Sequence, residues 1–147
     1  MLFRSICAVL LIIQFIRPTK NTGEIEGLQH ISKVIDIPEN INIILNNSCY
    51  DCHSNNTHYS WYSEIMPIGW WLNHHVEEGK EELNFSEFIL LPAKKQDRKL
   101  EEIKEEVIEK EMPLKSYKSM HKNAELTENQ IKLISDWVDV SRKKLQK

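Results

Sequence analysis

Two of the chain's three cysteines stand three positions apart and are followed at once by a histidine, in the run Cys49-Tyr50-Asp51-Cys52-His53. This C-x-x-C-H spacing is typical of covalent haem attachment, because two thiols so placed can add to the two vinyl groups on one edge of a porphyrin. The histidine that follows is then held under the iron as its proximal ligand. The motif therefore predicts one haem c, bound covalently through Cys49 and Cys52 and ligated by His53, around which the rest of the chain has to fold.

Three other interpretations of the cysteine pair remain to be weighed. A thioredoxin-like redox site expects a βαβ surround, which the pattern of this sequence does not offer. A zinc site would need further ligands, and only His53 and His58 come near the spacing of a zinc finger. A structural disulfide is compatible with an exported chain. The histidine directly after Cys52 favours haem over all three.

The second axial ligand is predicted from the methionines. An electron carrier usually has both axial positions of its iron filled, with Met or His as the second ligand. Met112 precedes Pro113, which stiffens the loop ahead of the last helix, so we expect its thioether to reach the haem face opposite His53. Met66 also precedes a proline, but it follows His53 closely in the chain and is the second choice. The other candidates are Met120, His58, His74, His75 and His121.

The beginning of the sequence is an apolar run over residues 2–16, with Arg4 near its start. This layout is typical of a secretory signal or a short membrane anchor. A helix over the run reaches about 22 Å at ~1.5 Å per residue, less than the ~30 Å of a bilayer's hydrocarbon core. No small-x-small cleavage site follows, because Arg17 and Pro18 end the run. We expect an exported, periplasmic protein, tethered to the inner membrane by residues 2–16 if they are uncleaved.

Helices dominate the predicted fold. Only 4 Gly and 5 Pro occur in 147 residues, which argues against a turn-rich β protein. We predict an all-α fold, namely a small cytochrome c-like helical domain with long loops around the haem. The expected divisions are a signal peptide or membrane anchor over 1–18, a linker over 19–36 and the haem-binding domain over 37–147.

Four helices are expected in that domain. The first begins at Pro38 and runs into Cys49, and the second begins after Pro67 and ends at Gly79. The third spans residues 94–110, with its glutamates on a solvated face, and the fourth begins at a capping box. The capping-box residues are Thr127 and Gln130, and the buried faces comprise Ile41, Ile44 and Leu45, then Leu100, Ile103 and Val107, then Ile131, Ile134, Trp137 and Val138.

A family resemblance extends over about three-quarters of the chain. Its residues agree with the family in order and spacing, and they are Cys49, Cys52, His53, Ser54, Asn55, Thr57, Tyr59, Trp61, Tyr62, Pro67, Trp70, Trp71, His74, Val76, Gly79, Asn84, Phe85, Ser86, Met112, Pro113, Tyr117, His121, Leu126 and Trp137. In these residues the chain resembles the haem-binding domain family of exported bacterial proteins, a branch of the c-type cytochromes. The resemblance implies a covalent haem c with His53 as one ligand and Met112, in the M-P position, as the other.

The net charge of the chain and the reactive groups it contains limit the classes of function that we expect. The net charge of −3 gives no basic surface for nucleic acid, and it becomes more negative without residues 1–18. We therefore expect redox partner proteins with basic docking patches. No acid–base pair is evident, so a single-haem electron carrier between larger redox partners is favoured over an enzyme. The alternative is a haem-based peroxidase or a gas or redox sensor with a labile sixth ligand.

Overall fold

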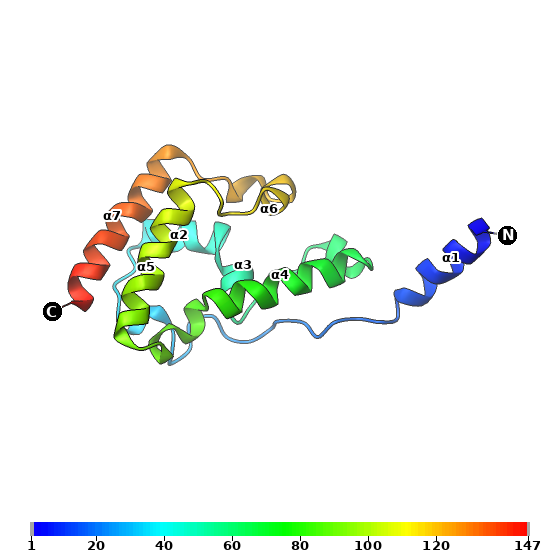
Figure 1. Ribbon diagram of the computed structural model, residues 1–147, viewed down its shortest axis with the longest axis horizontal. Coiled ribbons are helices and arrows are strands. Elements are labelled where there is room, and N and C mark those ends of the chain that lie inside the picture. Colours follow the sequence, from blue (N-terminus) through cyan, green and yellow to red (C-terminus); the bar gives the residue numbers. More distant parts are fainter. Residues whose placement is uncertain (1, 147) are drawn as a thin grey trace.

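Helices account for the regular structure of residues 2–146, which are the residues that the computed structural model describes (Figure 1). The prediction of an all-α fold is confirmed, and the β-type pairing within this range is an isolated bridge between Thr22 and Asn56. The α-helices are α1 (Leu2–Ile13), α2 (Glu39–Ser48), α3 (Tyr50–His53), α4 (Ile68–Glu82), α5 (Ala93–Ile108), α6 (Lys115–Met120) and α7 (Glu128–Leu145). Short 3-10 helices are η1 (Ile31–Lys33), η2 (Trp61–Glu64), η3 (Phe85–Leu90) and η4 (Lys122–Ala124).

The two longest helices, α5 and α7, lie side by side and run in opposite directions (Figure 1). Their predicted apolar faces are confirmed, because the expected residues of both helices are buried in one core. The predicted capping box of α7 is also confirmed: Gln130 donates its backbone N–H to Thr127 Oγ1, and Thr127 N–H donates to Gln130 Oε1 at 2.9 Å. Arg142 of α7 adds a charged contact to α5, with its Nε 2.9 Å from Asp97 Oδ1. This pair of helices forms one side of the domain (Figure 1).

Helix α2 packs against α7 and leads directly into the cysteine motif. Its predicted buried residues Ile41, Ile44 and Leu45 all lie in the core. Pro38 is the N-cap and the helix begins at Glu39, one position after the predicted start. Cys49 is both the C-cap of α2 and the N-cap of α3, so the motif begins at a break between two helices.

Residues 19–36, expected to be a linker, instead contribute side chains to the core. Ile31 is fully buried and Ile35 is 2% exposed, and both belong to the same core cluster as α2, α5 and α7. The segment is also held by hydrogen bonds, since Asn21 Nδ2 donates to the Ser54 carbonyl at 2.9 Å. Isolated aliphatic residues without a helical or strand period give no sequence signal of burial, which is why this segment resembled a linker.

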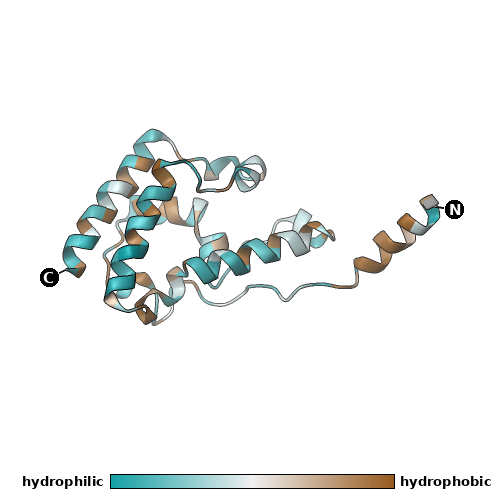
Figure 2. Cartoon of the chain, viewed as in Figure 1, coloured by the Kyte–Doolittle hydropathy of each residue, from teal (hydrophilic) through white to brown (hydrophobic). Residues whose placement is uncertain are grey.

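The N-terminal helix α1 is strongly apolar, and Figure 2 shows a hydrophobic colour over most of it beyond its first turn. It covers residues 2–13 of the predicted apolar run of 2–16, and most of its described side chains are exposed. Within residues 2–146 no helix combines the length and the apolar character needed to cross a membrane.

The role of residues 19–36 in the core can be tested with two aliphatic residues close together in the sequence. Ile31→Ala should lower the free energy of unfolding by about 2–5 kcal/mol, because it deletes a fully buried side chain. Leu28→Ala is the control: the side chain is 89% exposed, so its removal should change stability by no more than about 0.5 kcal/mol. Urea unfolding followed by helical circular dichroism measures both. Equal effects would mean that the segment is not part of the folded core.

Candidate functional site

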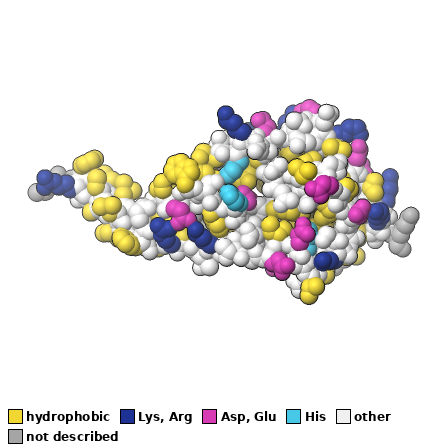
Figure 3. Space-filling model, turned by 180° about the vertical axis from the view of Figure 1, so that it is seen from behind, with side chains coloured by type: hydrophobic (Ala, Val, Ile, Leu, Met, Phe, Trp, Pro, Cys, Tyr) yellow, Lys and Arg dark blue, Asp and Glu magenta, His cyan; other side chains and the backbone are white. Residues whose placement is uncertain are grey.

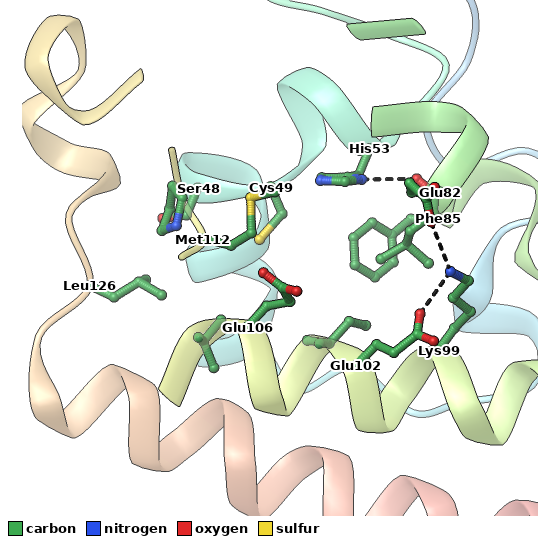
Figure 4. A pocket seen from close by; sticks show the side chains of 14 residues that line it. Ser48, Cys49, His53, Glu82, Phe85, Lys99, Glu102, Glu106, Met112 and Leu126 are labelled. Carbon is green, nitrogen blue, oxygen red and sulfur yellow. Dashed lines mark hydrogen bonds and ion pairs between the residues drawn. The ribbon is translucent and has the colours of Figure 1, made fainter. Parts of the chain in front are cut away.

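A crevice opens between the motif helix α3, the end of α4, helix α5 and the loop that follows α5 (Figure 4). It has two adjoining compartments of about 460 and 240 Å³, in the size range of ligand and cofactor sites. The residues that line both compartments are Ser48, Cys49, His53, Glu82, Met112 and Pro113. Two of the three predicted motif residues and the predicted distal ligand thus line the same space, and Cys52 lines its smaller compartment.

The imidazole of His53 is held in one orientation by main-chain carbonyls. Its Nδ1 lies 2.7 Å from the Gly79 oxygen and 3.0 Å from the Leu83 oxygen. Because both partners are acceptors, Nδ1 carries the proton, and in the neutral ring Nε2 keeps a free lone pair. Burial lowers the pKa of His53, which favours that neutral form. Figure 4 shows the second ring nitrogen directed toward the side of the crevice on which Cys49 and Met112 lie, as a metal-binding histidine requires.

The two motif cysteines are partly buried and are not joined by a disulfide. Burial raises the pKa of the Cys49 thiol to about 12, and the neighbouring Cys52 adds to the effect. Burial likewise raises the pKa of Cys52 to about 11, with a contribution from the charge of Asp51. A thioredoxin-like site needs a thiol whose pKa is lowered, so these environments oppose that interpretation. Both thiols stay protonated at neutral pH.

The prediction that Gly79 ends its helix is wrong. Helix α4 continues to Glu82, so Gly79 lies within it. A Cβ at this position would lie 2.8 Å from the Cys52 oxygen and 3.2 Å from Cys52 Cβ. The glycine is therefore required by the close approach of α3 to α4. The same approach brings the Gly79 carbonyl to His53, so one residue fixes both the helix packing and the ring.

Met112 reaches the crevice through the way in which α5 ends. Lys110 adopts a left-handed conformation with φ of 62°, which reverses the chain after the helix. The backbone N–H groups of Glu111 and Met112 then donate to the Glu106 oxygen at 3.1 and 3.2 Å. Met112 is partly buried and Pro113 is buried, so the loop packs against the crevice instead of extending into solvent.

Of the other candidate ligands named from the sequence, only His75 lines the described crevice. Met66, the second choice, is buried outside the crevice, between η2 and α4. His75 lines the smaller compartment, on the same side as Gly79. A separate polar depression, outside the crevice, is lined by His58, Met120 and His121, among others.

The aromatic residues of η2 and α4 lie outside the crevice. Two of them are largely exposed, Trp61 at 73% and Trp71 at 48%. The crevice instead takes its apolar lining from Phe85, Ile103 and Val107.

The α5 glutamates predicted to form a solvated face are exposed or partly exposed, as expected, and two of them also border the crevice. Glu102 and Glu106 both border the larger compartment. Lys99 Nζ lies 2.7 Å from Glu102 Oε2 and 3.4 Å from Glu82 Oε2, so it joins the two helices across the crevice (Figure 4). The three α5 residues share a face with Ile103 at helical spacing, and that spacing is the signal in the sequence that identifies them.

A hydrogen-bond network joins the cysteine motif to the segment that follows Met112. Tyr117 of α6 donates its hydroxyl to Asp51 Oδ2 at 2.7 Å, and the second oxygen of Asp51 accepts the His58 N–H at 2.9 Å. The Tyr117 ring stacks on His121, whose Nε2 lies 3.0 Å from the Tyr62 hydroxyl. Sequence reasoning did not connect these residues, because Asp51 and Tyr117 are far apart in the chain. Their contact ties the Met112 loop to the motif.

Comparison with models of protein families finds a match for most of the chain. The family model described as a haem-binding domain matches residues 8–140, which includes every residue of the crevice. No curated protein and no solved structure matches the chain.

The raised thiol pKa values predict a pH profile of alkylation. In haem-free protein carrying Cys7→Ser, Cys49 and Cys52 should react slowly with iodoacetamide at neutral pH and faster only as the pH nears 11–12, because the thiolate attacks. Urea-unfolded protein should react several pH units lower, near the ordinary thiol pKa of about 8.5. Mass spectrometry of samples quenched across a pH series counts the modified cysteines. Equal native and unfolded rates at neutral pH would contradict the burial of the thiols.

The close packing at Gly79 predicts a second, independent effect. Gly79→Ala should destabilise the fold by about 1–3 kcal/mol, because the added methyl group meets the backbone of Cys52. Gly27→Ala is the matched control, since a Cβ there would meet only the Glu24 side chain at 3.5 Å. Denaturant midpoints of the two variants give the comparison. A Gly79→Ala protein as stable as the Gly27→Ala protein would show that α3 and α4 can separate without cost.

Proposed function

The chain belongs to the family of haem-binding domains, and on this basis we propose that it is a c-type haem protein that carries single electrons. Cys49 and Cys52 would hold one haem c through thioether bonds, and His53 and Met112 would be the two protein ligands of its iron. The observation that carries the proposal is the meeting of these side chains at one crevice, with the His53 Nδ1 bonded to main-chain oxygens. The bound haem supplies an iron that changes its charge by one electron.

Contacts within the protein restrict the motion of both proposed ligands, His53 and Met112. The carbonyls of Gly79 and Leu83 accept from His53 Nδ1, which fixes the ring and makes Nε2 a better donor to a metal. Pro113 and the turn at Lys110 restrict the Met112 loop. Ligands that do not move when the charge changes suit electron transfer, since little has to reorganise.

The lining of the crevice supports the same role. Phe85, Ile103 and Val107 offer an apolar surface to a flat ring and keep water away from it. Lys99 is a cation at the edge of this surface, positioned by Glu82 and Glu102.

The location and partners of the protein follow from the same premise. We place the haem domain outside the cytoplasm, with α1 serving as a signal or as a tether at the inner membrane, because an apolar run with a basic start has that layout. The C-terminal half of α4 carries Glu77, Glu78, Glu81 and Glu82 beside the crevice. This acidic end suits a redox partner with a basic patch, and electron exchange that slows with added salt is the behaviour expected of such a pair.

The ligand assignment is tested by absorption spectra of the exported protein, oxidised and reduced, together with haem staining of denaturing gels. Wild-type protein should stain, show a weak far-red band typical of methionine–iron ligation, and fail to bind carbon monoxide. Met112→Ala should stain equally but lose the far-red band and bind carbon monoxide. Met120→Ala is the control, since that side chain is 53% exposed and lies outside the crevice.

Spectra that differ from these expectations would overturn different parts of the proposal. A far-red band that persists in Met112→Ala and disappears in Met66→Leu would transfer the distal role to Met66. Carbon monoxide binding by the wild-type protein would favour a sensor or peroxidase with an open iron site, for which His75 is the nearest histidine of the crevice. Absence of covalent haem from the exported protein would overturn the proposal as a whole.

A further inference from the structure

One end of the domain is bound to the chain segment that leaves α1. Gln14 and Met66 exchange two hydrogen bonds, from Gln14 Nε2 to the Met66 oxygen at 2.9 Å and from the Met66 N–H to Gln14 Oε1 at 3.0 Å. Trp70 Nε1 donates to the Ile16 oxygen at 2.7 Å. The side chains of Arg17 and Lys20 both form ion pairs with Glu64. The 3-10 helix η2 and the start of α4 are therefore fixed beside the apolar helix α1.

The same end exposes large apolar side chains. Four of them form what we call the η2–α4 apolar surface, namely Trp61 (73% exposed), Ile65 (43%), Ile68 (42%) and Trp71 (48%). It adjoins the segment after α1, where Phe15 is 88% exposed and Ile16 59%. Figure 3 shows hydrophobic side chains that continue from the N-terminal helix onto the adjoining end of the body. Soluble domains seldom leave a contiguous apolar surface of this kind uncovered.

The charges along α4 distinguish its two ends. The first half, residues 68–76, contains no acidic residue, whereas the second half carries Glu77, Glu78, Glu81 and Glu82. At ~1.5 Å per residue the helix keeps these ends roughly 20 Å apart. The cations Arg17 and Lys20 lie at the first of these ends, where they outnumber the one carboxylate, Glu64, with which both pair. An anionic lipid surface would therefore attract the end that carries the apolar surface and repel the end that lines the crevice.

We propose that the η2–α4 apolar surface lies in the interfacial layer of a phospholipid bilayer, beside α1. This inference rests on the membrane association included in the proposed function. Tryptophan is enriched at that depth, because its ring is apolar and its N–H is polar, and isoleucine reaches slightly deeper. With the surface so placed, α4 points its Glu78–Glu82 end away from the lipid. The crevice then opens toward soluble partners at a fixed height above the membrane.

Tryptophan fluorescence in vesicles tests this placement. The full-length, haem-loaded chain is reconstituted into vesicles of phosphatidylcholine and phosphatidylglycerol, with acyl chains that are either brominated near the headgroup or unmodified. Emission is expressed as the ratio between the two lipids, so that quenching by the haem cancels. Brominated lipid should lower the emission of the wild-type protein, and the double variant Trp61→Phe, Trp71→Phe should lose about half or more of that effect.

A matched control adds an exposed tryptophan away from the surface. Val140 of α7 is 53% exposed and lies far from α1 (Figure 1), so Val140→Trp should add emission that brominated lipid does not quench. Helical circular dichroism and haem staining of each variant show that the fold and the haem are retained.

The outcomes separate this inference from the proposed function. If the chain floats with vesicles but brominated lipid leaves its tryptophans unquenched, the surface proposal is overturned and the tether through α1 stands. A dimer in detergent would then assign the surface to a second copy of the chain. If the chain does not float with vesicles, both the surface and the membrane association are overturned, whereas the haem assignment stands on its spectra.

Discussion

The hydrogen bond from His53 Nδ1 to the Gly79 carbonyl is the contact on which the site depends. It exists because α3 and α4 approach so closely that a Cβ at position 79 would meet the backbone of Cys52. The contact sets the tautomer and direction of the imidazole and places the second cysteine at the wall of the crevice. A ring fixed in this way can serve as a metal ligand without first losing freedom of rotation.

Helix α5 and Met112 form the wall of the crevice opposite His53, and other contacts position them. Helix α5 is held against α7 by the buried core, and its left-handed end at Lys110 directs Met112 back toward the motif. The hydrogen bond between Tyr117 and Asp51 then ties the segment after Met112 to the motif itself. The two walls are thus connected at both the core and the rim, so the distance between His53 and Met112 does not rely on a single loop.

The local features of this fold could be predicted from the sequence, and the non-local ones could not. The buried faces of α5 and α7 follow from helical spacing, and the capping box at Thr127 lies within four residues. The roles proposed for Cys49, Cys52 and His53 rest on a motif of five residues. The role of Gly79 could not be predicted, because a glycine that ends a helix and one that permits a close contact look alike in sequence. The burial of Ile31 depends on core partners that no local pattern specifies.

The crevice is assembled from chain segments that meet only in the native fold: the end of α2 with α3, the end of α4, and α5 with its following loop. The unfolded chain therefore offers no comparable binding surface, and any group that fills the crevice shifts the folding equilibrium toward the native state by thermodynamic linkage. A group held by ordinary affinity would provide this stabilisation only while its free concentration stayed high. If the same group is attached through Cys49, at the junction of α2 and α3, it cannot be diluted away. The stability of the core then no longer depends on the free concentration of that group.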